Sequence, residues 1–586
     1  MSSSEPQSAE CSEHTGDPGV VQSFRHWFRL QPKAVRVALF VLVLFSLALH
    51  TVGVGWGLPN GNRSWSADAL QPLTPLAIGR HVLFGDSWNS GWFYFKYPVG
   101  HPLVLLAAQG PLLVGMWLSG ELQRPQRDYP YGFKDPERSL ARLSVVTRLV
   151  SAIMGTAVVF FAYCIVALLL SSAVAGLWSA VTVAGLYPLV FYSHTSNVDV
   201  PLLFWLALCC CAVLWSARTD SRRATVLAGA GAAMALLTKE QGIGFLLAMP
   251  VVWVLTRSWR PNSLGWAGAW RHASAGALAF AVVTVIVANV LWNPAGYVNR
   301  WRFLLGTLPA ETREKYAPYQ FLTQVPQTFS LAREAAKFER SLSSVMHVMQ
   351  PAAAAAAGVG VVLCAWLAPR AVVALGLAGL TYYLASLRAL ELVQVRYVLP
   401  LAFVACLAVG GIGALIERRG VHRIGAVMLA VWALVALAPG VETVRLLLSD
   451  PRYAAERWFA AHGPAHGVRA EIYQPLTYLP RFPLNWEVKR VRLAERTREK
   501  FLARMPDLVV LSSAGSAGLT GTYRRQRQPG ESFFEESPAA QDFIRALRAG
   551  ELGYDLAAEF QTPTWLRSRI PSLNPKISVY RRRGIL

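Results

Sequence analysis

Acidic and basic side chains recur in the polar segments between the long apolar runs of this chain. The first such segment, residues 57–142, contains Asp68, Asp86, Lys96 and Tyr97. A carboxylate at the mouth of a helical bundle can take a proton from a hydroxyl group, and a nearby lysine can hold a phosphate. A single Asp in a loop is more often a helix N-cap or a solvated side chain. The segment therefore suggests proton transfer and phosphate binding, with the structural alternative left open.

Two other charged positions stand at the ends of apolar runs. Asp199 precedes Pro201. It could simply cap a helix that has the proline in its first turn. Lys239 and Glu240 place a charge pair between two apolar runs, where a plain turn at the membrane surface would also explain them. Both positions are candidates for chemistry, and both have a structural explanation.

The composition indicates a membrane protein. Of the 586 residues, 54% are hydrophobic and 15% are charged, a balance that several soluble cores could not bury. Apolar runs of about 17 to 25 residues recur from Val35 to Leu446, and a helix needs about 20 residues to cross the hydrocarbon. The predicted spans lie near 34–56, 145–169, 174–192, 199–216, 224–238, 241–256, 274–292, 350–367, 371–387, 396–416 and 423–444.

We therefore predict a polytopic α-helical membrane protein with about 11–12 transmembrane helices and a C-terminal soluble α/β domain. Residues 1–33 form a cytoplasmic leader ahead of a signal anchor, and residues 34–448 form the transmembrane domain. Residues 449–586 have no spanning run and mixed periodicity, as expected for a water-soluble domain.

Basic loops predict the orientation. With the leader inside, the loops 218–223, 257–271 and 417–423 all face the cytoplasm, as the positive-inside rule requires. One crossing by the apolar run 98–119 would invert all three, so that run should be re-entrant or lie along the outer interface. The predicted outer segments are loop 57–142, the turns at Asp199 and Lys239, loop 293–349 and the C-terminal domain. Long loops are usually functional, so the chemistry is expected on this face.

Charge and cysteine usage exclude several other classes. The net charge of +22 comes largely from loops between apolar runs, so it reflects topology and does not indicate a nucleic-acid partner. None of the seven cysteines lies in the C-terminal domain, which excludes a disulfide scaffold or zinc ribbon there. Residues 209–211, all cysteine, lack the spacing of metal ligands and are interpreted as small packing residues.

The order of the motifs along the chain resembles the GT-C glycosyltransferases. Within that superfamily it is most similar to the branch of protein O-mannosyltransferases and the aminoarabinose transferase of lipid A. In the membrane domain, the motifs are the acidic first outer loop, Lys96-Tyr97-Pro98, Asp199 with Pro201 and Phe204-Trp205, Leu237-Thr238-Lys239, and Arg396-Tyr397-Val398-Leu399-Pro400. In the C-terminal domain, they are Asp450-Pro451-Arg452-Tyr453 with Trp458, a predicted strand at 506–511, and Asn574-Pro575 before a final strand ending at Tyr580.

The resemblance implies roles for individual residues. Asp68 matches the first-loop acid that acts as catalytic base or orients the acceptor, although Ala69 stands where the family often has Glu. Asp199 matches a further outer acid. Lys96 and Tyr97 compete for the phosphate-contacting position. Two more residues, Lys239 and Arg396, resemble basic positions near the lipid phosphate.

The resemblance also implies a reaction. A sugar would pass from a polyprenyl-phosphate carrier to a hydroxyl group of a protein, lipid or glycan acceptor, in one displacement with inversion. We expect no cofactor and no metal site. Short loops and the likeness to the bacterial branch favour a bacterial inner membrane, with the active site on the periplasmic face and membrane lipid as surroundings.

Two rival interpretations remain at this stage. A transporter or flippase would also be basic, helical and polytopic, but it should show inverted repeats and acids near the bilayer midplane. The candidate polar residues gather at one face instead. The second rival is a catalytically inactive relative, which the residue Ala69 keeps open.

Overall fold

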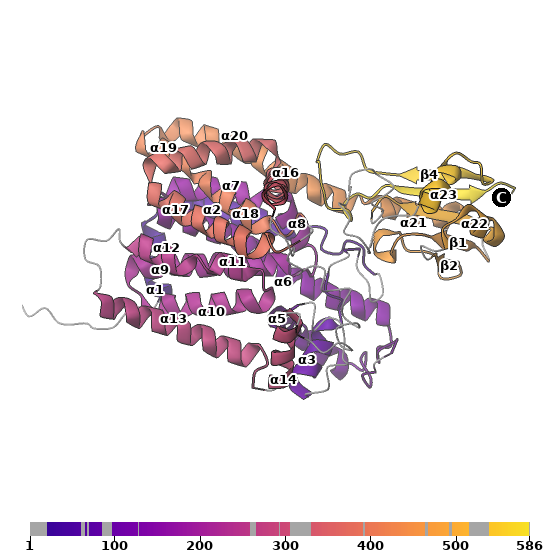
Figure 1. The fold of residues 1–586 in the computed structure, drawn as a ribbon, viewed down its shortest axis with the longest axis horizontal. Coiled ribbons are helices and arrows are strands. Elements are labelled where there is room, and N and C mark those ends of the chain that lie inside the picture. The colour runs from indigo at the N-terminus through magenta and orange to yellow at the C-terminus, as the bar shows by residue number, and fades with distance from the viewer. Residues whose placement is uncertain are drawn as a thin grey trace, which may run out of the picture.

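The computed structural model describes residues 20–59, 65–66, 69–84, 97–126, 128–257, 265–291, 293–304, 307, 330–390, 393–462, 467–491, 495–514 and 538–584. Helices from α1 to α20 form an elongated bundle, and the remaining elements form a separate α/β domain at one end of it (Figure 1). We call that end of the bundle the domain end. The bundle helices are α1 Val20–Leu30, α2 Lys33–Thr51, α3 Thr74–Phe84, α5 Gly100–Leu118, α6 Pro136–Leu170, α7 Ala173–Ala184, α8 Tyr187–Ser193, α9 Asp199–Thr219, α10 Arg222–Thr238, α11 Gly242–Leu246, α12 Met249–Arg257, α13 Trp266–Val287, α14 Pro294–Leu304, α16 Leu331–Leu367, α17 Pro369–Tyr382, η2 Tyr383–Leu387, α18 Leu399–Ala408, α19 Gly410–Arg418 and α20 His422–Leu448.

The helical bundle confirms the predicted polytopic membrane fold. Among the described residues, nine helices are long and apolar enough to cross a membrane, or ten if the bent pair α7 and α8 is one span. Each predicted span coincides with one or two helices. The spans predicted at 224–238 and 241–256 correspond to α10 and to α11 with α12, which are too short to count among the nine. Hydropathy succeeds here because a spanning helix must be apolar along its whole length.

The two predicted outer loops contain much helix. Segment 57–142 holds α3, α5 and the start of α6, and segment 293–349 holds α14 and the first half of α16. Helix α16 bends at Gln350, whose φ is 63° and ψ is 158°. Of the described helices that lie wholly within these two segments, α5 alone is long and apolar enough to count as a candidate membrane span.

Helix α5 passes the length and composition test for a membrane span, yet its contacts lie at the domain end. A Cβ on Gly100 would stand 2.7 Å from the carbonyl oxygen of Leu237, at the end of α10. Further along α5, the Gln109 side chain donates to the carbonyl of Pro72, and Met116 packs with Leu140 near the start of α6. These contacts place α5 beside the ends of α10 and α6, and the expectation that the run 98–119 is re-entrant or lies along the outer interface stays a prediction.

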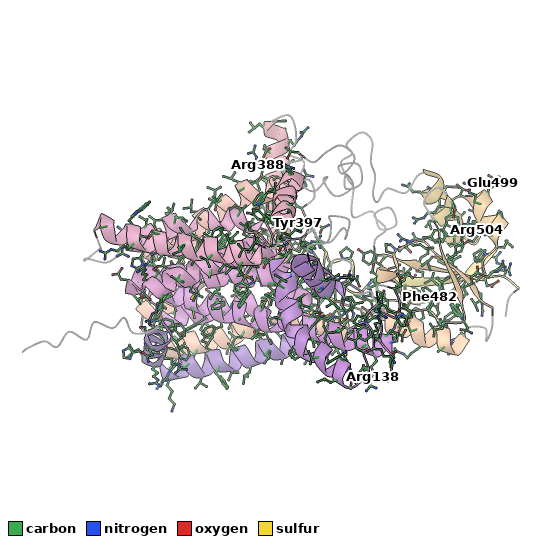
Figure 2. The ribbon with its side chains drawn as sticks, turned by 90° about the horizontal axis from the view of Figure 1, so that it is seen from below. Arg138, Arg388, Tyr397, Phe482, Glu499 and Arg504 are labelled. Carbon is green, nitrogen blue, oxygen red and sulfur yellow. The ribbon has the colours of Figure 1, made fainter. Side chains whose placement is uncertain are left out.

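Helix α6 is the longest straight element of the site region. Its first turn is capped by Asp135, whose carboxylate accepts from the Arg138 N–H. With 35 residues it measures about 52 Å at 1.5 Å per residue, well beyond the roughly 30 Å of the hydrocarbon. Its start at Arg138 therefore projects past the bundle toward the C-terminal domain (Figure 2).

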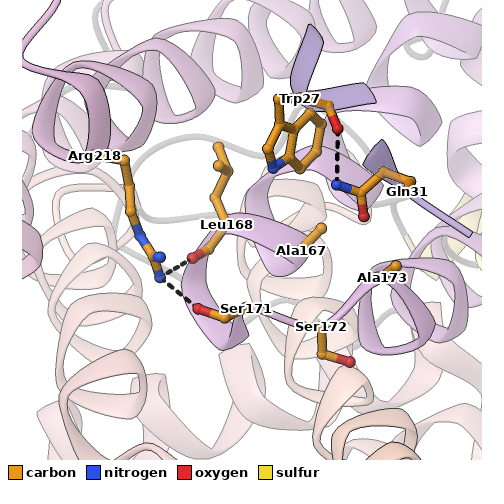
Figure 3. A pocket seen from close by; sticks show the side chains of 8 residues that line it. All are labelled: Trp27, Gln31, Ala167, Leu168, Ser171, Ser172, Ala173 and Arg218. Carbon is orange, nitrogen blue, oxygen red and sulfur yellow. Dashed lines mark hydrogen bonds between the residues drawn. The ribbon is translucent and has the colours of Figure 1, made fainter. Parts of the chain in front are cut away.

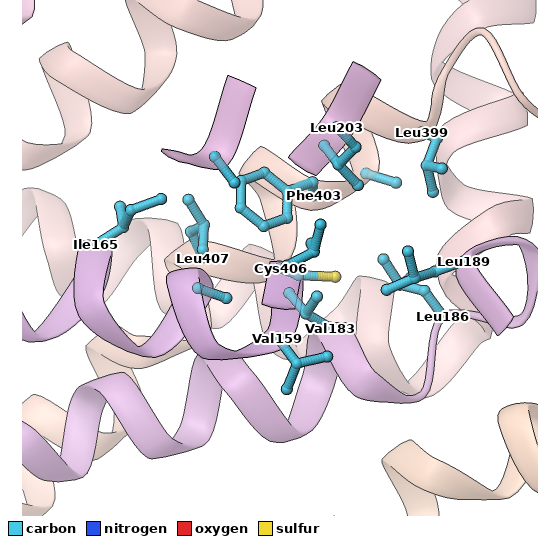
Figure 4. Packing of buried hydrophobic residues seen from close by; sticks show 14 of the residues in the cluster. Val159, Ile165, Val183, Leu186, Leu189, Leu203, Leu399, Phe403, Cys406 and Leu407 are labelled. Atoms are coloured by element: carbon cyan, nitrogen blue, oxygen red, sulfur yellow. The ribbon is translucent and has the colours of Figure 1, made fainter. Parts of the chain in front are cut away.

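The bundle core is built from α6, α7, α9 and α18. Apolar side chains from these helices surround Cys406, which is fully buried (Figure 4). Small residues let the backbones approach: a Cβ on Gly229 would stand 2.1 Å from the Gly276 carbonyl oxygen of α13. Such close packing is the main source of helix association inside a membrane. The buried cysteines at 209–211 belong to this core, as their interpretation as packing residues requires.

The C-terminal domain confirms the predicted α/β class. Its sheet has the order β2-β1-β3-β5-β4, in which β1 runs parallel to β2 and β3, while β5 is antiparallel to β3 and β4. Helix α21 packs on one face, through Phe459, and helices α22 and α23 pack on the other, through Phe501 and Phe543. The elements are α21 Pro451–His462, β1 Arg469–Ile472, η3 Leu476–Tyr478, β2 Glu487–Arg490, α22 Arg498–Arg504, β3 Leu508–Ser512, α23 Pro538–Arg548, β4 Tyr554–Phe560 and β5 Ile577–Arg582.

The segment 562–573, which we call the docking segment, returns from β4 to the bundle before β5 begins. Leu566, Ile570 and Leu573 are buried in the same apolar cluster as the bundle helices. The Thr564 hydroxyl donates to Glu442 of α20 over 2.6 Å. The C-terminal domain is therefore packed into the bundle at a second place, far along the chain from α20.

Candidate active site

The centre of the candidate site is an ion pair between two helix ends. Asp199 begins α9, and Lys239 follows the last residue of α10. The Lys239 ammonium lies 2.5 Å from Oδ1 of Asp199, and both side chains are less than a tenth exposed. Desolvated charges attract strongly, so removing either partner would leave an uncompensated buried charge.

Asp199 does not cap its helix. The N-cap residue of α9 is Val198, with no side-chain capping bond, and the N–H of Asp199 donates to Oδ1 of Asn197 over 2.7 Å. The Asn197 side chain thus accepts a hydrogen bond from the first turn of α9, as the side chain of a capping Asp would. The carboxylate of Asp199 is directed to Lys239, 40 positions further along the chain.

Tyr397 joins this pair to a second cation. The Lys239 ammonium stands 4.5 Å from the centre of the Tyr397 ring, and the Arg396 guanidinium stands 4.9 Å from the same ring. Arg396 also donates to the Tyr397 hydroxyl over 3.0 Å. The Tyr382 hydroxyl donates to the Tyr397 carbonyl and fixes the backbone there. Tyr397 lies at the domain end (Figure 2), so two cations and one carboxylate meet around one aromatic ring.

The first long segment approaches the same turn. Leu70 exchanges two hydrogen bonds with Ser196: its N–H donates to the Ser196 carbonyl, and the Ser196 hydroxyl donates to the Leu70 carbonyl. Tyr97 is buried in a small cluster with Leu70, Leu105 and Val198. Tyr97 therefore packs beside the Asp199 turn as an apolar neighbour within this cluster.

Two of the predicted site residues, Asp68 and Lys96, lie outside the described residues. Of the others, Asp199, Lys239 and Arg396 come together around Tyr397, and Tyr97 packs against Val198. Tyr397 belongs to one of the motifs of the sequence, but the sequence alone assigned it no role. Its position directly after Arg396 was the available signal, because aromatic faces bind cations.

More charged side chains surround this centre. Glu240, next to Lys239, forms an ion pair with Arg300 of α14. On another side, Arg388 pairs with Glu334 of α16 over 2.9 Å. The pairing of Lys239 and Glu240 with partners on α9 and α14 goes beyond what a plain surface turn would need. In each of these pairs one cation balances one carboxylate, so the pairs themselves add no net charge to the site.

A small cavity of about 180 Å³ is lined by Trp27 of α1 and by residues around the end of α6 (Figure 3). Helix α1 lies at the end of the bundle opposite the C-terminal domain (Figure 1). Arg218 donates there to the Leu168 carbonyl and to the Ser171 hydroxyl, at the end of α6. A helix C-terminus repels anions, and the guanidinium already compensates it. This cavity therefore has the character of a helix cap and lacks that of a phosphate site.

The structure shows no group of three or more His, Cys, Asp or Glu side chains suited to a metal ion among the residues that it describes. The expectation of a metal-independent reaction remains a prediction, since Asp68 and Asp86 lie outside those residues.

A second buried ion pair joins the bundle to the C-terminal domain. Arg452 donates to both carboxylate oxygens of Asp450, and both side chains are fully buried. The indole N–H of Trp56 also donates to Asp450 over 2.9 Å, and the guanidinium lies 4.2 Å from the ring centre of Trp65. Arg452 also donates to the carbonyls of Thr477 and Ser572. This junction fixes the C-terminal domain against the first long segment.

Comparisons with known proteins bear on the candidate site. Residues 74–304 match the family model described as dolichyl-phosphate-mannose-protein mannosyltransferase. The match includes Tyr97, Asp199 and Lys239, and leaves Asp68 and Arg396 outside. No curated protein is significantly similar to the chain.

Solved structures give distant similarities. The oligosaccharyltransferase of Archaeoglobus fulgidus, in complex with Zn and sulfate, aligns with a TM-score of 0.45 and 12% identity over 82% of this chain and 69% of that chain. ArnT from Cupriavidus metallidurans, bound to undecaprenyl phosphate, aligns with a TM-score of 0.41 and 14% identity over 92% of this chain and 97% of that chain. At these values the alignments say nothing about individual residues. The family match, in contrast, confirms that residues 74–304 resemble glycosyltransferases whose sugar donor is linked to a lipid phosphate.

Proposed function

We propose that this chain is an inverting glycosyltransferase that moves a sugar from a polyprenyl-phosphate carrier to a hydroxyl group at the domain end. The observation that carries the proposal is the buried Asp199–Lys239 pair next to Tyr397 and Arg396. It lies where spanning helices end, and a lipid-linked donor needs a site that meets both the membrane and water. Two of its four residues fall within the family match.

In the proposed reaction, the acceptor hydroxyl attacks the anomeric carbon of the donor. The bond from that carbon to the phosphate oxygen breaks, and the carrier phosphate leaves with the electron pair. Asp68 takes the hydroxyl proton. Negative charge grows on the leaving phosphate, and fixed cations in a partly dry site stabilise it. Lys239 and Arg396 supply such cations, and Lys96 is the third candidate.

Asp199 then has a positioning role. Its carboxylate accepts from the Lys239 ammonium, so it holds that cation in place and offsets its charge while the donor is absent. The outer orientation of the domain end, a bacterial inner membrane, and the acceptor class of protein, lipid or glycan belong to the same proposal. So does the expectation that a chelator leaves the activity intact.

The test compares wild type with Asp68→Asn in reconstituted membranes. Radiolabelled polyprenyl-phosphate sugars are supplied, and transfer into protein, lipid and glycan fractions is measured. We expect transfer by wild type and a loss of about 10² to 10⁴ in the variant, because a base is removed while the shape is kept. Asp128→Asn is the matched control, since Asp128 is exposed in the same long segment.

A loss below tenfold in Asp68→Asn would refute the base assignment. Absence of transfer from every donor by folded wild type would refute the enzyme and favour the transporter or the inactive relative. The fraction that receives the label identifies the acceptor class.

A further inference from the structure

Three side chains near the Asp199 turn are buried yet hold polar atoms without a hydrogen-bond partner. Among the residues that the structure describes, neither ring nitrogen of His101 has a partner, and neither do Nδ2 of Asn197 and Oδ2 of Asp199. His101 and Asn197 are fully buried, and Asp199 is 3% exposed. Buried polar groups are nearly always paired, and leaving one unpaired costs stability. Each such group calls for an explanation, and a role in binding or catalysis is one.

His194 shows what a satisfied histidine looks like at the same end of the bundle. It is equally buried, but its ring nitrogens lie 2.8 Å and 2.7 Å from the carbonyl oxygens of Val190 and Val52, so the N–H of either tautomer has an acceptor. The chain therefore can satisfy a buried imidazole at this depth, and it does not do so for His101.

The unpaired groups belong to neighbouring elements. His101 lies one helical turn before Leu105 on α5, and side chains four residues apart share a helix face. Leu105 belongs to the same buried cluster as Val198, the residue that stands between Asn197 and Asp199 in the sequence. At the same place, Gly100 contacts the end of α10 beside Lys239. His101 therefore belongs to the part of α5 that packs beside the Asn197–Asp199 turn.

The chemistry of the unpaired atoms defines the ligand. The amide Nδ2 of Asn197 needs an acceptor, whereas the carboxylate oxygen of Asp199 needs a donor. A fully ionised phosphate ester offers acceptors alone, so it would leave Asp199 unpaired. Hydroxyl groups offer both, and neighbouring hydroxyls on a sugar ring pair naturally with an amide and a carboxylate side by side.

We infer that His101, Asn197 and the second oxygen of Asp199 bind the sugar of the lipid-linked donor, while Lys239 and Arg396 serve its phosphate. The inference rests on the proposed function and adds to it the residues that select the sugar. It divides the site into a cationic part around Tyr397 and a sugar part between α5 and the start of α9.

The test measures stability and binding on the same variants. His101→Leu replaces an unpaired imidazole with an apolar group of similar size. We expect an equal or higher melting temperature without ligand, because no hydrogen bond is lost. Binding of bare undecaprenyl phosphate should stay unchanged. Binding of the undecaprenyl-phosphate sugar that wild type prefers, among a panel of hexose and pentose esters, should weaken about tenfold or more.

His194→Leu is the matched control. It removes a buried histidine whose nitrogens have partners, so it should lower the melting temperature and leave the sugar preference as in wild type. Asn197→Ser is the second variant, because a serine oxygen can still accept from the Asp199 N–H while the amide donor is gone. It should also lose sugar preference and keep affinity for the bare carrier.

The binding measurements distinguish a failure of this inference from a failure of the proposed function. Equal sugar preference in wild type, His101→Leu and Asn197→Ser overturns the inference while leaving the proposed function standing. Failure of wild type to bind the bare carrier overturns the proposed function, and the inference with it. A His101→Leu melting temperature that falls as far as that of His194→Leu also contradicts the inference, since it shows a structural role.

Discussion

Two buried ion pairs stand at the domain end, and they differ in how completely they are satisfied. In the Asp450–Arg452 pair, both carboxylate oxygens accept hydrogen bonds, Trp56 adds another, and the guanidinium reaches two carbonyls beyond its partner. In the Asp199–Lys239 pair, one carboxylate oxygen contacts the ammonium, and the other has no hydrogen-bond partner within the described part of the chain.

The difference separates a structural pair from one that is ready for a ligand. Burying charges is favourable only when hydrogen bonds complete the geometry. The complete pair locks the C-terminal domain to the first long segment, and nothing is left for a substrate to contact. The incomplete pair carries a cost in the empty protein, and substrate binding would recover it. The following predictions order these effects by size.

The largest effect is expected for Arg452→Met. Asp450 would keep its charge in a fully buried site without its cation, which costs about 3–5 kcal/mol. We expect a large drop in melting temperature in detergent and faster proteolysis near residue 449. Arg583→Met is the control, because this arginine is exposed in a similar carboxylate pair. Equal melting temperatures for the two variants would contradict the structural role of the junction.

A smaller effect on stability, with a large effect on rate, is expected for the double variant Asp199→Asn, Lys239→Gln. Both charges are removed together, so neither is left uncompensated, and the stability should change little. The leaving phosphate loses a fixed cation, and the transfer rate should fall about 10² to 10³. Initial rates with labelled donor and thermal unfolding measure both quantities. Retention of more than a tenth of the rate would assign this pair to structure.

The smallest effect is expected for Asp555→Asn, which removes the exposed pair with Arg583. The Arg583 hydrogen bond and charge lower the pKa of Asp555 below its ordinary value of 3.8. A lowered pKa in the folded state means that the stabilisation is present at neutral pH and is lost as the pH falls through that pKa. Both side chains are more than half exposed, so solvent screens the pair. Melting temperatures of variant and wild type should coincide at pH 7 and at pH 3, and a clear difference at pH 7 alone would show that exposed pairs matter here.

Much of the fold follows from sequence because its physical cause is local. A helix that crosses a membrane must be apolar over its length, so α2, α9 and α20 stand out in composition. The strand predicted at 506–511 corresponds to β3, and all five residues from Leu508 to Ser512 are buried in the structure. Helix α1 was missed inside the leader, although Phe24, Trp27 and Phe28 recur at helical spacing. A search for spans overlooks such a short amphipathic helix.

The site was predictable only as a set of candidates. Asp199, Lys239 and Arg396 were chosen from separate motifs, but their meeting at Tyr397 depends on how α9, α10 and α18 pack. His101 had no signal of its own, because a histidine at the start of an apolar run is unremarkable until its lack of partners is seen. The role of Asp450 and Arg452 was hidden for the same reason: Trp56 lies almost 400 positions away.

The docking segment has a consequence for how the protein is made. Leu566, Ile570 and Leu573 complete the core of the bundle, yet the ribosome adds them after every helix of that core. Until this segment has been synthesised, the bundle holds an uncovered apolar surface where these side chains belong. A prematurely terminated chain keeps that surface, which is the feature that chaperones and proteases recognise. A bundle that lacks the docking segment thus differs from one that has it by an exposed apolar surface at the place of Leu566, Ile570 and Leu573.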